Sequence, residues 1–194
     1  MVFRRCFTGL SPSSCGAFQE LRIRQLRIHK HRDNAAMIRG IHHVAIHVHD
    51  MDRMLKFYKA AFGFEVMGEP FSWSNDAFID KIVNIPNSAA RGAMLRAGTC
   101  YVEIFQYSEP KPNVSTPLNG FDKGYTHFCV DCTDIESEYE RLKGLGMTFS
   151  QPAPIDVGHV KSIYGRDPEG NLIEIQETAA HCDFRMDKLP PVAK

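Results

Sequence analysis

Polar and apolar residues alternate through residues 40–52, and this alternation predicts a strand. Successive side chains of a strand point to opposite faces. One face carries Ile41, His43, Ala45 and His47, and the other carries His42, Val44, Ile46 and Val48. Histidine is the commonest metal ligand in proteins, but histidines on both faces cannot all bind one ion. The stretch alone leaves two interpretations open, a metal site or a polar strand face.

The residues after this strand follow a helical period and then return to strand alternation. Asp50 is a suitable N-cap for a helix over residues 51–62, and Gly63 can end it. The later predicted elements are a strand over 64–67, a short helix over 76–83, and strands over 91–97 and 99–107 joined at Gly98. The predicted order is βαβ(α)ββ.

A segment rich in proline and glycine, residues 108–124, is typical of a linker. Beyond it the same pattern begins again. The predicted elements are a strand over 125–131, a helix capped by Thr133 or Asp134 that buries Ile135, Tyr139 and Leu142 and stops at Gly144 or Gly146, and strands over 147–150, 159–164 and 172–176. A turn over 166–170 joins the last two strands.

The two halves of the chain match at an offset of 84 residues, which places His43 on His127 and Asp50 on Asp134. Gly63 falls on Gly146 after one deletion. A strand, a cap, a helix and a glycine in one register indicate a duplicated unit. The predicted fold class is therefore α+β, with two tandem βαβββ modules, and the repeat selects His43 from its neighbours.

Each predicted module also has a glutamate in its last strand. Glu103 and Glu174 are both flanked by β-branched residues, although glutamate is depleted in strands. One such residue is easily explained by a solvated strand face. Two at equivalent places favour a metal site built from His43, Glu103, His127 and Glu174.

These residues lie in motifs that resemble a known family. The motifs are H-V-A-I-H-V-x-D-M-D, V-E-I, H-F-C-V-D and D-P-E-G-N-L-I-E-I, and the likeness covers about residues 39–177. They resemble the vicinal oxygen chelate superfamily, which includes glyoxalase I, methylmalonyl-CoA epimerase, extradiol dioxygenases and the fosfomycin- and bleomycin-resistance proteins. The resemblance implies a cupped, barrel-like mixed sheet with helices outside. Its concave face would hold one divalent metal on His43, Glu103, His127 and Glu174.

Two imidazoles and two carboxylates neutralise a divalent ion and suit Zn, Ni, Co, Fe or Mn. Open coordination positions would accept a small substrate with two adjacent oxygens. The function that this implies is a metal-dependent lyase or isomerase of the glyoxalase type, which abstracts a proton next to a chelated carbonyl. Glu103 or Glu174 would be the base. His47 and Tyr107 replace the residues that anchor glutathione in bacterial-type enzymes, so we do not expect glutathione as a cofactor.

Two other functions compete with this one. An extradiol-type Fe(II) dioxygenase would use His43, His127 and Glu174, and Glu103 would then be surplus. A metal-free binding protein of the bleomycin-resistance kind would need none of these ligands. Side chains that share strand faces with the ligands are candidates to line a substrate pocket or, alternatively, to pack in the core. These are His47, Tyr101, Phe105, Tyr107 and Cys129.

Composition excludes several partners. Lys plus Arg and Asp plus Glu number 23 each, so no net charge attracts nucleic acid or acidic membranes. No apolar run is long enough to cross a bilayer. The six cysteines form no disulfide framework, and Cys129 and Cys132, three apart on a strand, point to opposite faces, which favours a structural role. We expect a cytoplasmic protein.

Residues 1–36 are rich in arginine and poor in acids, which fits an organellar transit peptide or translated sequence upstream of a start at Met37. We expect this extension to be disordered. The predicted domain spans residues 38–178, with module 1 over 38–108, a linker over 109–124 and module 2 over 125–178, followed by a tail over 179–194. The linker allows a monomer or a homodimer that exchanges modules.

Overall fold

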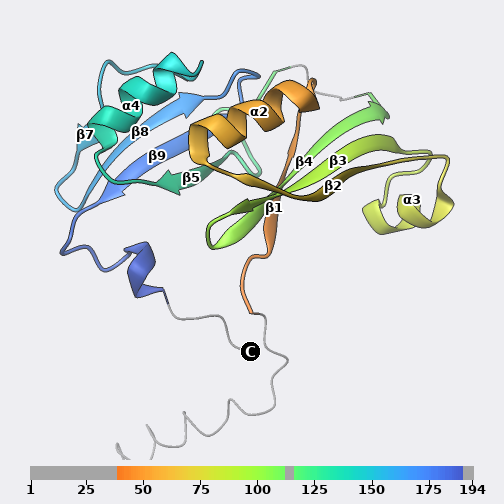
Figure 1. The fold of residues 1–194 in the computed structure, drawn as a ribbon, viewed down its shortest axis with the longest axis horizontal. Helices are drawn as coiled ribbons and strands as arrows, with labels where there is room; N and C mark the ends of the chain where they lie inside the picture. The colour runs from red at the N-terminus through yellow and green to blue at the C-terminus, as the bar shows by residue number, and fades with distance from the viewer. Residues whose placement is uncertain (1–38, 112–115, 190–194) are drawn as a thin grey trace, which may run out of the picture. The chain divides into compact units, whose positions relative to one another are not determined.

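The computed structural model describes residues 39–111 and 116–189 (Figure 1). The predicted extension over residues 1–36 and the start at Met37 lie outside the described residues. Among the residues described, no helix is both long enough and apolar enough to span a membrane.

Module 1 consists of β1 to β4 with two helices. Its elements are β1 (His43–His47), α2 (Met51–Phe62), β2 (Glu65–Ser74), α3 (Ala77–Val83), β3 (Ala89–Ala97) and β4 (Cys100–Glu109). The sheet order is β1-β4-β3-β2, in which β1 and β4 are parallel and the other pairs are antiparallel. The predicted order βαβ(α)ββ is confirmed, while β2 runs seven residues beyond the predicted end at Met67.

Module 2 consists of β5 to β9 with one helix. Its elements are β5 (His127–Asp131), α4 (Ile135–Gly144), β6 (Thr148–Phe149), β7 (Ile155–Asp156), β8 (Val160–Arg166) and β9 (Leu172–Thr178). The sheet order is β5-β9-β8-β6, with β7 also paired to β8. The two-residue β7 is too short to give an alternation signal. The α+β class with two βαβββ modules is confirmed, and in the described residues the two sheets do not join into a closed barrel.

Helix α2 begins and ends where the sequence predicts. The side chain of Asp50 accepts a hydrogen bond from the Arg53 amide at 3.0 Å. Gly63 has a φ of 66° and donates its amide to the Lys59 carbonyl, a left-handed cap that favours glycine. Between these caps the helix buries Met51, Met54, Phe57, Tyr58 and Ala61.

Helix α4 repeats this arrangement in module 2. The structure selects Asp134 rather than Thr133 as the N-cap, since the Asp134 side chain accepts from the Ser137 amide at 3.3 Å. The predicted apolar face of Ile135, Tyr139 and Leu142 is buried.

The core lies on the strand faces opposite the histidines and glutamates. Val102 and Ile104 of β4 and Ile173 and Ile175 of β9 are at most 1% exposed and pack in one cluster with both helices. Alternation then turns Glu103 and Glu174 to the other face. Core packing therefore decides which side of each sheet carries the candidate ligands.

The turn after β8 connects the two modules. Asp167 is 3% exposed, and its carboxylate accepts from the Tyr58 hydroxyl at 2.7 Å and from the Asn171 side-chain amide at 2.8 Å. Glu169 accepts from the amides of His49 and Asp50 at 2.6 and 2.7 Å. Burial, and then the neighbouring Asp167, raises the pKa of Tyr58 far above its ordinary value. The D-P-E-G-N turn thus fixes the end of β1 and α2 to module 2.

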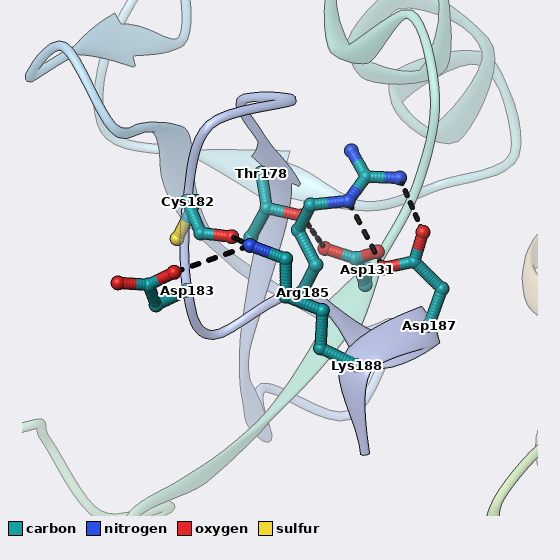
Figure 2. Close-up of polar contacts among 7 residues, drawn as sticks. All are labelled: Asp131, Thr178, Cys182, Asp183, Arg185, Asp187 and Lys188. Atoms are coloured by element: carbon teal, nitrogen blue, oxygen red, sulfur yellow. Dashed lines mark hydrogen bonds and ion pairs between the residues drawn. The ribbon is translucent and has the colours of Figure 1, made fainter.

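The segment after β9 folds back against module 2 (Figure 2). Cys182 is 5% exposed, and its carbonyl accepts from the Lys188 ammonium at 2.7 Å. Arg185 forms an ion pair with Asp187 at 2.9 Å next to a short 3-10 turn over Met186–Lys188. Its guanidinium lies beside Asp131, the last residue of β5. This segment therefore borders the end of the sheet face that carries His127.

Candidate metal centre

In module 1 the pairing of β1 with β4 brings His43 next to Glu103. The parallel register places His43 opposite Tyr101 and Ala45 opposite Glu103, so both candidate ligands lie on the same sheet face. The distance from His43 Nε2 to Glu103 Oε2 is 3.3 Å. The His43 side chain is 41% exposed and that of Glu103 is 15% exposed. We call these two residues the module 1 pair.

The same pairing in module 2 brings His127 next to Glu174. Strands β5 and β9 are parallel, with His127 opposite Leu172 and Cys129 opposite Glu174. The distance from His127 Nε2 to Glu174 Oε2 is 3.5 Å, and the side chains are 30% and 19% exposed. This module 2 pair occupies the positions of the module 1 pair in the repeat.

The structure assembles the predicted ligands in two pairs rather than in one group. No three His, Cys, Asp or Glu side chains in the described parts of the chain gather closely enough to hold a metal ion. Each pair depends only on the strand register within its own module. The contacts that join the modules include those of the shared core cluster and of the Tyr58–Asp167 hydrogen bond, and none of these involves the candidate ligands.

A tyrosine that was not predicted joins the module 2 pair. Tyr164 of β8 lies opposite Glu174, donates its hydroxyl to Glu174 Oε2 at 3.0 Å, and lies 3.2 Å from His127 Nε2. Burial, followed by the hydrogen bond to Glu174, raises the pKa of Tyr164 to about 12. Alternation on both sides of the predicted 166–170 turn would have placed Tyr164 on this face. The corresponding position in module 1, opposite Glu103, is Met94.

His47 lies on the face of the module 1 pair. Its Nδ1 is 3.4 Å from the Tyr107 amide, and its Nε2 is buried without a hydrogen-bond partner among the described residues. Burial, and then neighbouring His49, lowers the pKa of His47 below its ordinary value. A buried polar atom without a hydrogen-bond partner destabilises the folded state. Packing alone therefore does not explain why a histidine occupies position 47.

The other predicted pocket residues fall in two groups. Phe105 and Tyr107 contact Trp73 with ring centroids 5.9 and 5.8 Å apart, whereas Tyr101 stacks on His42 at 5.0 Å. Trp73 and its neighbour Phe71 were not predicted, because strand β2 was expected to end before them.

Cys129 lies next to the module 2 pair, and Cys132 packs against the core cluster, as the alternation predicts. Both are free thiols. Desolvation raises the pKa of each thiol to about 12, with a further contribution from Glu174 at Cys129 and from Glu138 at Cys132. A thiol is a poor nucleophile when its pKa is raised, which agrees with a structural role for this C-x-x-C.

A hollow of about 630 Å³ lies elsewhere, at the ends of β2, β3 and β4. Its lining includes Ser72, Arg91 and Gln106, together with Trp73 and Tyr107, but neither residue of the module 1 pair. By alternation Ser72, Arg91 and Gln106 lie on the sheet face that packs on α2, whereas Trp73 and Tyr107 lie on the face of the module 1 pair. The hollow therefore extends to both faces at this end of the sheet.

Comparison with known proteins identifies the family. The model of the Glyoxalase/Bleomycin resistance protein/Dioxygenase superfamily matches residues 40–175. The chain belongs to this superfamily.

Two curated relatives are enzymes. A 2-epi-5-epi-valiolone epimerase from an Actinomyces species is 26% identical over 152 residues, which cover 75% of this chain and 82% of that protein. The lactoylglutathione lyase of Schizosaccharomyces pombe is 24% identical over 141 residues, covering 70% of this chain and 46% of that protein. The chain thus spans about half the length of the lyase.

A solved structure supports the fold. A glyoxalase family protein from Bacillus cereus superposes with a TM-score of 0.65 at 17% identity and covers 77% of this chain and 99% of its own. Taken with the curated relatives, the family match makes this chain an enzyme of the glyoxalase superfamily.

Proposed function

We propose that this chain is a divalent-metal-dependent lyase or isomerase that removes a proton next to a carbonyl group of a small substrate with two adjacent oxygens. The observation that carries the proposal is the duplicated His–Glu pair, with Nε2 to Oε2 distances of 3.3 and 3.5 Å at equivalent strand positions. The epimerase and lyase relatives support this type of reaction.

The donor atoms fit a divalent ion. Each pair offers one imidazole nitrogen and one carboxylate oxygen on a partly exposed face, and such mixed ligation suits Zn, Ni, Co, Fe or Mn. When bound, the ion would supply a Lewis acid that polarises the substrate's oxygens. His43, Glu103, His127 and Glu174 would hold it. His47 and Tyr107 replace the residues that anchor glutathione in bacterial-type enzymes. The proposed substrate is therefore not a glutathione adduct.

A second copy of the chain completes the site in this proposal. The module 1 pair of one subunit would meet the module 2 pair of its partner, and twofold symmetry would create two identical sites. Support comes from the separation of the pairs in the described part of one chain and from the partial exposure of all four side chains.

Glu103 is the proposed base. Tyr164 donates a hydrogen bond to Glu174 Oε2, whereas the polar contact of Glu103 in the described structure is with His43. We therefore assign to Glu103 the removal of the proton from the substrate carbon and its return, while Tyr164 holds Glu174 in place.

Metal content and subunit mixing test the proposal. One variant combines His43→Ala with Glu103→Gln, and the other combines His127→Ala with Glu174→Gln. Neither variant by itself should bind a stoichiometric amount of metal, as measured by elemental analysis of untagged protein. After mixing and subunit exchange, each heterodimer has one intact site, so about a quarter of the wild-type metal should return if exchange is statistical. No recovery, with dimers of normal size, would contradict a shared site.

Activity assays distinguish the reaction types. Metal-reconstituted protein should isomerise α-hydroxy-carbonyl compounds, and Glu103→Gln should lower turnover by about 100-fold or more as the general base is lost. Oxygen uptake with catechols after Fe(II) loading would support the dioxygenase alternative instead. Protein that binds no metal and is unaffected by Glu103→Gln would support a ligand-sequestering protein.

A further inference from the structure

We propose that four aromatic rings of module 1 form a wall that binds a planar, apolar ring of the substrate next to Glu103. The wall consists of Phe71, Trp73, Phe105 and Tyr107. This inference rests on the proposed function, because it assigns the class of substrate that the same site accepts: a compound that carries an aromatic ring beside its two adjacent oxygens.

Strand register places the wall on the ligand face. On β4, Glu103, Phe105 and Tyr107 are alternate residues and therefore share one face. Phe71 and Trp73 of β2 lie opposite Gly92 and Ala90 of β3, which in turn lie opposite Phe105 and Tyr107. Small residues in the middle strand thus separate two pairs of rings. Neighbouring residues on one face of a strand are about 7 Å apart. Phe105, the first residue of the wall on β4, therefore lies about this far along the strand from Glu103.

The rings pack against one another in a fixed arrangement. Trp73 meets Phe105 and Tyr107 nearly at right angles, 86° and 88°, at 5.9 and 5.8 Å. Phe71 is stacked beside Trp73 at 6.2 Å. Edge-to-face and offset contacts of this kind stabilise aromatic clusters. The wall is a shaped surface rather than a set of separate side chains.

Gly92 allows the wall to form. A Cβ atom at position 92 would overlap the end of the Phe71 ring and lie 3.1 Å from Phe105 Cε1. The Phe71 ring therefore lies directly on the backbone of β3, in space that any other residue would fill. Glycine in a strand interior is otherwise unfavourable, so its presence here agrees with a requirement for close approach.

The indole of Trp73 is held at its polar edge, which leaves its face available. Its Nε1 donates to Ser88 Oγ at 2.7 Å, and this fully buried serine donates to Asp80 at 2.7 Å. Asp80 lies in α3 and also accepts from the Ser88 amide at 2.9 Å. With the N–H satisfied, the exposed ring surface favours an apolar partner and offers no hydrogen-bond donor to it.

The wall remains open in the described chain. Phe71 is 42% exposed, and nearby Met67 is 41% exposed on the same face. Large apolar side chains grouped at this exposure mark a binding surface. Among the described residues of module 2 there is no counterpart, because β7 supplies only Ile155 and Asp156. A planar ring would therefore bind on the module 1 side of the site.

Two hydroxamates test the wall, because they share one chelating group and differ in whether it carries a phenyl or a methyl group. Metal-loaded full-length protein is titrated calorimetrically with benzohydroxamate and with acetohydroxamate. Benzohydroxamate should bind about tenfold tighter or more, given the usual strength of aromatic contacts. It should also quench the fluorescence of Trp73, the only tryptophan in the chain. In Trp73→Leu the advantage of the ring should fall to about threefold or less.

Controls distinguish failure of the wall from failure of the proposed function. Phe78→Leu changes another exposed aromatic residue of module 1, 71% exposed on α3, and should keep the full preference. Metal bound normally with equal affinity for both hydroxamates would overturn the wall and leave the proposed function standing.

If the protein binds no metal, the wall is tested alone. Ligand-observed NMR with 2-naphthol should then detect binding to wild-type protein that Trp73→Leu abolishes. No binding of 2-naphthol would overturn the wall. Loss of dimers in Trp73→Leu, without ring binding in wild type, would likewise overturn it in favour of a subunit interface.

Discussion

Module 1 and module 2 place the same two side chains on the same two strands but surround them differently. The module 1 pair has Met94 beside it and an aromatic wall one strand position away. The module 2 pair has the hydroxyl of Tyr164 within 3.2 Å of both His127 Nε2 and Glu174 Oε2. The two modules therefore share the candidate ligand positions and differ in what surrounds them. Module 1 supplies apolar surface, and module 2 supplies hydrogen bonds.

The difference extends to the strands that flank each pair. Strand β2 has ten residues and carries Phe71 and Trp73, whereas β6 and β7 have two residues each. A long edge strand can hold two rings against its neighbour, and a short one cannot. The two modules therefore divide the work of the proposed site: module 1 shapes the substrate's surroundings, and module 2 orients a ligand.

The largest effect is expected where the modules are joined. Asp167→Ala leaves the Tyr58 hydroxyl and the amides of Glu169 and Asn171 without their acceptor. Each buried group that loses its partner costs about 1–3 kcal/mol, so the free energy of unfolding should fall by about 3 kcal/mol or more. Chemical denaturation measures this. Asp187→Ala, which removes an exposed carboxylate from a surface ion pair, is the control and should have no measurable effect.

The number of unfolding transitions gives further information. Wild type should unfold in one transition, because residues of both modules share one core cluster. A separate early transition in Asp167→Ala that involves only module 2 would show that the Asp167 turn, rather than the core, makes the modules cooperative. An unchanged midpoint would contradict the structural role assigned to this turn.

Two glycines provide a matched test of the two modules. In Gly165→Ala the new Cβ would lie 2.5 Å from Phe149 and 2.8 Å from Met147, which is 2% exposed. Overpacking of this kind should cost about 1–3 kcal/mol. In Gly92→Ala the clash is with the tip of Phe71, which is 42% exposed and can rotate away. That variant should lose less than about 1 kcal/mol, yet it should reduce the preference for benzohydroxamate.

Thermal unfolding and calorimetric titration of both variants check this contrast. If the Gly165→Ala variant remains folded, it should keep the preference for benzohydroxamate over acetohydroxamate. The reason is that Gly165 lies opposite the buried Ile173 on the core face. Equal losses of stability in the two variants would show that Phe71 is held as firmly as a core residue.

The sequence predicted the elements whose signals are local. Asp50 and Gly63 bound α2 as expected because a cap needs only neighbouring residues. Strand β2 was predicted too short because a register shift between Met67 and Phe71 interrupts its alternation. Of the four wall residues, Phe105 and Tyr107 therefore lay on a predicted strand, whereas Phe71 and Trp73 lay beyond the predicted end of β2.

The pairs were predictable because the repeat gives each histidine a partner in the same register. Their separation was not, because it depends on contacts such as Tyr58 with Asp167, 109 residues apart in the chain. No periodicity or motif records how one module packs on the other. The position of Tyr164 was partly predictable. Alternation places it on the face of Glu174 only once the register of the hairpin between β8 and β9 is known.

Tyr164→Phe tests the hydrogen bond that distinguishes the module 2 pair. The hydroxyl contacts both His127 and Glu174 and should hold their side chains in orientation. Loss of such an outer contact typically weakens metal binding about 10–100-fold, and we expect the lower end of this range because Tyr164 is 40% exposed. Competition with a chromogenic chelator measures the affinity. Tyr125→Phe, at a fully exposed tyrosine, is the control. Tighter metal binding in Tyr164→Phe would show that the hydroxyl obstructs the ligands.

His47 should give the smallest effect, and it is specific to module 1. Burial lowers its pKa from 6.5, so the folded state favours the neutral ring and the unfolded state binds more protons as the pH falls. The resulting stability is fully present above about pH 6.5 and decreases at lower pH. His47→Leu removes this dependence and also the unpaired Nε2. The variant should match or exceed wild type by less than about 1 kcal/mol at pH 7, with a growing advantage at pH 5. Denaturation at both pH values measures it, with the exposed His159→Leu as control. A variant less stable than wild type at pH 5 would mean that the ring has a partner and is retained for stability rather than for a role at the site.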